Sequence, residues 1–309
     1  MIVKKACQIF LLTLCGPFLC AQELKVFTKA DFELRGKVKS CQVITGYGKE
    51  VFEFDRNGVL TKSVTQYNDT DQDISYYKYD DGNLVEKRLE SYKDGVLDAA
   101  TSMANIYVID TTGTKNIQEK IVSYDKTFLE LQEYQFDEEG RLVKLTTSHQ
   151  NAVDEIVVEY SNYKDEATKT YFLNGVIQKS IRSSKKKDAT GKIQELVLTK
   201  EFVDGMPSKA MELLYDPQGT LLSEEVFMYD GSQEQFVSKE KQSYRYSAMG
   251  FLSKTFIRRG NAESLKEFIF QFDDSEQKNW VKKIMTPDNT YTTRKIEYYT
   301  EAKIEERPN

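Results

Sequence analysis

Three aspartates in one short segment have a spacing that could bind a metal ion. They stand at alternate positions: Asp69, Asp71 and Asp73. The oxygen ligands in the first half of an EF-hand calcium loop have the same spacing, and Asp80 stands where the closing acid would be. However, Ile74 replaces the glycine that such a loop requires, and residues 74–79 alternate as a strand. A solvated hairpin turn therefore explains the segment better, and calcium binding is the alternative.

Other side chains that could do chemistry are few. His149 is the single histidine and lies in a predicted turn, so a catalytic triad or a histidine metal site would depend on it alone. Cys41 is the only cysteine beyond residue 21, which excludes an internal disulfide and a sulfur-ligated zinc site in that part of the chain. We interpret Cys41 as a small apolar strand residue. The sequence predicts no catalytic residue and no cofactor.

Composition excludes several classes of protein. The 309 residues include 19 Tyr, 17 Phe and one Trp, too many aromatic residues for a disordered chain. Asp and Glu total 49 against 43 Lys and Arg, and the formal net charge of −6 argues against a nucleic-acid footprint. With so many acids, spacing alone cannot identify a catalytic carboxylate pair.

The first 21 residues resemble a bacterial secretory signal peptide. Lys4 and Lys5 form a positive region, residues 9–14 are apolar, and Ala21 suits a cleavage site. The apolar run is too short to span a membrane, and nothing after it is similarly apolar. We therefore expect an exported protein, periplasmic, secreted or at the cell surface, with no transmembrane segment once the signal is removed.

A repeat of about 27 residues runs along the chain. Residues 52–62 define its unit, an aromatic–polar–aromatic stretch followed by Asp, two variable residues, Gly, and then Leu. Similar units occur at 77–87, 134–144, 214–221 and 244–254, and weaker copies fill the gaps. The residues that mark the repeat turns are Asp55, Gly58, Asp80, Gly82, Asp110, Gly113, Asp137, Gly140, Asp188, Gly191, Asp216, Gly219, Gly250 and Asp273.

The pattern of each unit predicts a β-hairpin. Alternate aromatics share one face of a strand, Asp accepts hydrogen bonds from the turn backbone, and Gly takes a positive φ. A second set of turns falls midway, as in Asp94-Gly95, Asn174-Gly175 and Asp204-Gly205, which favour two-residue type I′ turns. We predict about 18–20 strands, with a short helix near residues 28–34.

The fold class is therefore all-β, a repetitive antiparallel hairpin meander. It could form an elongated curled sheet, a solenoid-like spiral or a closed barrel. Strands of about ten residues also suit an outer-membrane barrel. The charged stretches at 183–187 and 238–242, and a last residue, Asn309, that is not aromatic, argue against that variant.

The repeat unit resembles the YD repeats of Rhs/YD-repeat proteins. The opening residues 34–40 and the closing segments 279–283 and 294–298 resemble exported YD-repeat-like proteins of Bacteroidetes-type bacteria. This resemblance implies an extracytoplasmic β-sheet scaffold. The toxin domain that large Rhs proteins enclose is not expected, because the chain stops about ten residues after its last predicted strand. We expect a signal peptide (1–21), a lead-in (22–33), a repeat domain (34–299) and a polar tail (300–309).

Repeats use almost the whole chain, which favours a non-enzymatic protein. We expect it to offer an extended surface to an envelope partner, a protein or a glycan. The alternatives are a structural envelope or assembly component, pairing through unpaired terminal strands, and a glycan-active enzyme. The aromatic residues could stack on a ligand, or they could fill the core of the sheet.

Overall fold

The computed structural model describes residues 25–300 and shows an all-β chain preceded by one short helix. The predicted signal peptide and residues 301–309 of the predicted tail lie outside the described residues. Within 25–300, no helix is long and apolar enough to cross a membrane.

The described chain contains one 3₁₀ helix and 21 strands. Their bounds are η1 (Lys29–Phe32), β1 (Val38–Thr45), β2 (Gly48–Phe54), β3 (Leu60–Gln66), β4 (Gln72–Asp80), β5 (Asn83–Lys93), β6 (Val96–Leu97), β7 (Met103–Asp110), β8 (Asn116–Ser123), β9 (Phe128–Phe136), β10 (Leu142–Ser148), β11 (Val153–Tyr163), β12 (Glu166–Leu173), β13 (Val176–Lys187), β14 (Ile193–Val203), β15 (Met206–Tyr215), β16 (Leu221–Asp230), β17 (Gln235–Tyr246), β18 (Leu252–Arg259), β19 (Ala262–Phe272), β20 (Trp280–Thr286) and β21 (Thr290–Tyr298).

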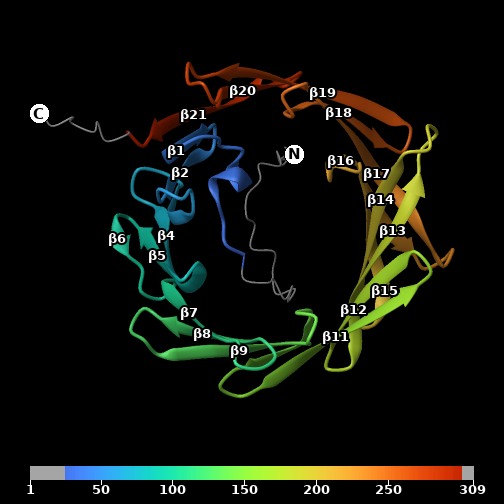
Figure 1. The fold of residues 1–309 in the computed structure, drawn as a ribbon, viewed down its shortest axis with the longest axis horizontal. Coiled ribbons are helices and arrows are strands. Elements are labelled where there is room, and N and C mark those ends of the chain that lie inside the picture. Colours follow the sequence, from blue (N-terminus) through green and yellow to red (C-terminus); the bar gives the residue numbers. More distant parts are fainter. Residues whose placement is uncertain (1–24, 301–309) are drawn as a thin grey trace, which may run out of the picture.

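The meander closes into a barrel of 20 antiparallel strands (Figure 1). Each long strand pairs with its sequence neighbours, and β1 pairs with both β2 and β21, which joins the two ends of the sheet. The two-residue β6 pairs only with β5, beside the wall. Closure decides among the three predicted arrangements: the sheet is neither open nor a spiral. It also leaves no free terminal edges, so edge-to-edge assembly through terminal strands loses its basis.

The repeat turns all lie at one end of the barrel, because turns of a meander alternate between ends. We call this end the Asp-turn rim. In the turn after β2, the Asp55 Oδ1 accepts hydrogen bonds from the backbone N–H groups of Asn57 and Val59, at 2.9 and 2.8 Å. Gly58 has φ +86°, and a Cβ there would lie 2.9 Å from the Lys29 side chain. The same carboxylate-capped turn recurs at Asp137, Asp188 and Asp216.

Two repeat turns differ from the prediction. Asp80 is the last residue of β4 and pairs with Asn83, and the turn is made by Asp81 and Gly82, both at positive φ. The copy that is one residue shorter therefore forms a two-residue turn, which needs no aspartate cap. Gly113 is not among the glycines at positive φ; in its turn the Asp110 Oδ1 accepts from the N–H and hydroxyl of Thr112.

The opposite rim carries the predicted type I′ turns. Both residues of Asp94-Gly95, Asn174-Gly175 and Asp204-Gly205 have positive φ, as this turn type requires.

A tyrosine joins each of three repeat units to the preceding one. The hydroxyls of Tyr79, Tyr160 and Tyr246 donate to the carbonyls of Leu60, Leu142 and Leu221, at 2.8–2.9 Å. Each carbonyl belongs to the leucine that restarts the strand after a repeat turn. All three leucines lie beside a register shift in the pairing with the preceding strand. The tyrosine supplies a partner that the sheet ladder lacks there.

Residues 25–37, which we call the lead, lie inside the ring (Figure 1). The predicted short helix is confirmed as η1. Phe27, Phe32 and Leu34 pack against Phe52 and Phe54 on the wall. The face of the wall that carries Phe52 and Phe54 is therefore the inner face. Residues directly opposite on paired strands share a face, so the register extends this assignment around the barrel.

Candidate functional site

The three aspartates of the alternative calcium interpretation do not form a metal site. Asp71 accepts hydrogen bonds from the Asn68 side chain and the Asp94 N–H, both at 2.8 Å, and these bonds lower its pKa. Asp73 accepts from the Tyr67 hydroxyl at 2.8 Å. Within residues 25–300, no three His, Cys, Asp or Glu side chains form a group that could hold a metal ion. The structure thus gives the calcium interpretation no support.

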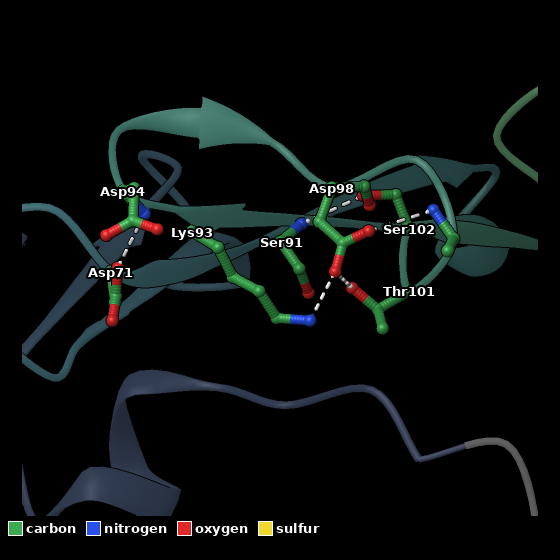
Figure 2. Close-up of polar contacts among 8 residues, drawn as sticks. Asp71, Ser91, Lys93, Asp94, Asp98, Thr101 and Ser102 are labelled. Carbon is green, nitrogen blue, oxygen red and sulfur yellow. Dashed lines mark hydrogen bonds and ion pairs between the residues drawn. The ribbon is translucent and has the colours of Figure 1, made fainter.

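Asp71 instead helps to fasten the loop after β5 (Figure 2). Asp98 in this loop pairs with Lys93 and accepts from the Thr101 hydroxyl at 3.0 Å. The buried Ser102 hydroxyl donates to the Asp98 carbonyl at 2.8 Å and accepts from the Ser91 N–H at 3.0 Å. Each of these polar groups has a protein partner, so the network stabilises a rim loop.

His149 lies in the turn between β10 and β11, as predicted. Its Nδ1 is 3.2 Å from the Glu130 Oε2. Cys41 is buried in β1 and faces inward, and burial raises the pKa of its thiol to about 11. A thiol with such a pKa is a poor nucleophile at neutral pH.

The aromatic residues of the repeats face inward near the Asp-turn rim. Phe54, Phe136 and Trp280 are 2–5% exposed. Two clusters form there, one around the lead and one around Ile117, Tyr134, Phe136, Leu142, Leu145, Ile156, Val158 and Tyr171. These rings serve mainly as core, the second of the two sequence interpretations.

Next to this layer, the lumen is lined with polar side chains that are unevenly distributed. Strands β7–β11 turn Glu119, Glu130 and Asp154 inward. The two Lys residues in these strands, Lys120 and Lys144, face outward by register. We call this stretch the acidic sector.

Glu119 is the most buried acid of the acidic sector, at 8% exposure. Its carboxylate accepts from the Asn105 amide at 2.6 Å and from the hydroxyls of Tyr107 and Tyr134 at 3.0 and 2.8 Å. Burial, followed by the Glu119 charge, raises the pKa of both tyrosines. Among residues 25–300, the donors found for this carboxylate are all neutral.

Strands β18–β21 and β1 form the opposite kind of wall, the basic sector. Arg259, Lys266, Lys283 and Arg294 face inward there. None of these five strands turns an acid inward. The acids that they contain lie on the outer face beside outward partners: Glu263 with Arg258, Glu267 with Lys254, and Glu297 with Ser40. Figure 1 places β8 and β9 on the side of the ring opposite β19 and β20.

The basic sector meets the lead at Trp280. The Arg294 guanidinium stacks 3.4 Å from the Trp280 ring centroid, and the Lys283 Nζ lies 5.1 Å from it. The Trp280 Nε1 donates to the Glu33 Oε2 at 3.0 Å. The Asn279 side chain brackets Arg35 by accepting from its N–H at 2.8 Å and donating to its carbonyl at 2.9 Å.

The outer face of the wall is rich in charge. Cross-strand ion pairs occur on strands around the ring, among them Lys62–Glu53 at 3.2 Å, Lys144–Glu155, Lys241–Glu225 at 2.8 Å and Lys254–Glu267 at 2.6 Å. Exposed apolar side chains also occur on this face, among them Ile269 and the directly opposed pair Phe256 and Leu265.

Sequence reasoning did not find the two sectors. Their charged residues are scattered over 25–300 and alternate with outward charges of either sign, so no local pattern distinguishes them. The signal that could have found them is the strand period of two, applied strand by strand once the inward face was known.

No family model matches the chain, and no curated protein matches it. Among solved structures, a porin-like protein from Bacteroides uniformis is 11% identical, with a TM-score of 0.33, covering 84% of this chain and 96% of its own. A porin-like protein from Bacteroides vulgatus is 10% identical, with a TM-score of 0.25, covering 85% and 98%. A protein of unknown function from Bacteroides fragilis is 14% identical, with a TM-score of 0.20, covering 56% and 92%. Likenesses with such low scores say nothing about what this chain does.

Proposed function

We propose that this chain is an exported, non-enzymatic β-barrel of the cell envelope that binds a polar ligand, a glycan or a protein segment, in its lumen. The observation that carries the proposal is the inner wall, where charged and hydrogen-bonding side chains line the space next to a packed aromatic layer. Twenty strands about 4.8 Å apart and tilted by about 40° enclose a wall roughly 40 Å across. A lumen of this width accommodates a chain-like ligand.

The outer wall supports a barrel that faces water. Burying a single Lys or Arg at the middle of a bilayer costs about 2–4 kcal/mol. The ion pairs at Lys62, Lys144, Lys241 and Lys254 would add such costs on several sides of the barrel. We therefore expect the exported protein to be monodisperse without detergent, and aggregation that only detergent relieves would contradict this part of the proposal.

Adjacent serines on β13 allow a matched test of the lumen. Ser183 faces inward, opposite Ala167 and Val197, whereas Ser184 faces outward, opposite Leu196. Each is replaced by Cys in a Cys41→Ala background and labelled with a bulky maleimide. Binding of fractionated envelope oligosaccharides and peptides is then measured by mass spectrometry and calorimetry.

The label at S183C should abolish binding, and the label at S184C should leave it intact. Equal loss from both labels, or loss from the outer label alone, would overturn a lumen site. Failure of the unlabelled protein to bind any fraction would overturn the proposal as a whole.

A further inference from the structure

The lumen cation Arg294, which lies with Lys283 against Trp280, stands out because two of its guanidinium nitrogens have no acceptor among residues 25–300. Within the described residues, the Arg294 Nε and Nη1 are buried and donate to no protein acceptor. The contacts found for both side chains are with the Trp280 ring. Buried charged donors without acceptors are rare in folded proteins and mark a place where another group belongs.

The neighbouring strands do not neutralise these cations. β1 contains no acid, and β18–β21 turn none inward. The nearest inward acids on flanking strands are Glu240 of β17, which pairs with Arg259, and Glu50 of β2, whose pKa burial raises. The one carboxylate that interacts with both cations is Glu33 of the lead, and its Oε2 accepts from Trp280. Two cations thus face one acid, which leaves an excess of positive charge.

We propose that Lys283 and Arg294 form an oxyanion-binding site in the lumen, for a sulfate, carboxylate or phosphate group. This inference deepens the proposed function, on which it rests, by naming the chemistry of the ligand. A planar guanidinium presents donors that match the oxygens of such groups, and the Lys283 ammonium adds a point charge. The lead holds Glu33 at the margin of this site.

The single tryptophan makes the site directly observable. Trp280 contacts both cations, so its fluorescence reports anion binding without any other label. Sodium sulfate is titrated into the exported protein against sodium chloride at constant ionic strength. The test variant is Lys283→Met. The control is Lys169→Met, because Lys169 is also a lumen lysine over an aromatic ring, 5.1 Å from Tyr171, and lies outside the basic sector.

Wild type and K169M should show a saturable change with sulfate, and K283M should bind at least tenfold more weakly. A wild type without a saturable change, or a K283M variant that binds as wild type does, would overturn the proposal. Circular dichroism and the thermal midpoint verify that K283M is folded. Arg294→Lys, which keeps the charge and loses the planar fork, should weaken binding less than K283M.

A second arm separates a free anion from an anionic group on a larger ligand. A sulfated disaccharide is compared with its neutral counterpart. Preference for the sulfated sugar over inorganic sulfate indicates a ligand-borne group, and equal affinity indicates a site for the free anion. Because these probes are defined compounds, the site can be verified even where the search for an envelope ligand fails.

Discussion

The acidic and basic sectors of the lumen hold their charges in opposite ways. Glu119 is surrounded by three neutral donors and needs no further partner. Arg294 is stacked on Trp280 with two buried nitrogens lacking acceptors. A satisfied buried carboxylate stabilises the wall, whereas an unsatisfied buried cation weakens it unless something binds. We therefore infer that the acidic sector stabilises the barrel and that the basic sector binds the ligand.

The largest expected effect comes from breaking the acidic sector. Glu119→Ala removes the acceptor of Asn105, Tyr107 and Tyr134, so we expect a loss of about 3 kcal/mol or more in the free energy of unfolding. Urea unfolding measures it. Glu133→Ala, on the outer face of neighbouring β9, should cost under about 0.5 kcal/mol. Equal losses for the two variants would show that Glu119 is not a structural centre.

The second-largest effect is expected from alkaline pH, which should destabilise the acidic sector. The folded pKa values of Tyr107 and Tyr134 are raised, so the unfolded chain loses these protons first. Their contribution is complete below the ordinary tyrosine pKa of about 10 and falls as pH rises beyond it. Tyr107→Phe should reduce this slope by up to about 1.4 kcal/mol per pH unit, measured by urea unfolding between pH 9 and 11. An unchanged slope, or an equal effect of exposed Tyr47→Phe, would contradict the assignment.

A smaller effect is expected from a substitution that tests anion binding in the basic sector. Glu33→Gln removes the one lead carboxylate that faces Lys283 and Arg294 but keeps an acceptor for the Trp280 Nε1. Because Glu33 is exposed to solvent, screening limits its influence, and we expect sulfate to bind about threefold more tightly. Trp280 fluorescence measures this, and weaker binding in the variant would show that Glu33 does not compete with the anion.

The smallest effect should come from the outer wall. Lys254→Met removes the 2.6 Å pair with Glu267, in which both side chains are nearly half exposed. Exposed pairs contribute little, so the free energy of unfolding should change by less than about 0.5 kcal/mol. Arg259→Gln, which leaves Glu240 unpaired on the inner face, should cost more. A larger loss of stability for Lys254→Met than for Arg259→Gln would mean that the outer face is less hydrated than the inner face.

Much of the fold was predictable because its signals are local. The capped turn at Asp55, the type I′ turn at Asn174-Gly175 and the alternating aromatics each depend on a few adjacent residues. The turn at Asp80 was mispredicted, because removing one residue from the unit exchanges a capped turn for a two-residue one. The bond from Tyr246 to Leu221 could not be predicted, since it joins residues in different units.

The candidate site was less predictable. The aspartates at 69–73 resembled a ligand set in sequence, yet in the fold Asp71 accepts from Asn68 and Asp94, and Asp73 accepts from Tyr67. Lys283 and Arg294 belong to no sequence motif. Their importance depends on the five strands of the basic sector, which turn no acid inward.

The sequence by itself determined the hairpin repeat, the strand period and the positions of the turns, because short-range backbone and side-chain bonds decide them. The tertiary structure alone decided that β1 pairs with β21 and that the sheet encloses a lumen. Closure gives every alternating side chain an inner or an outer position. It thereby separates into two opposite sectors charges that are evenly mixed along the chain.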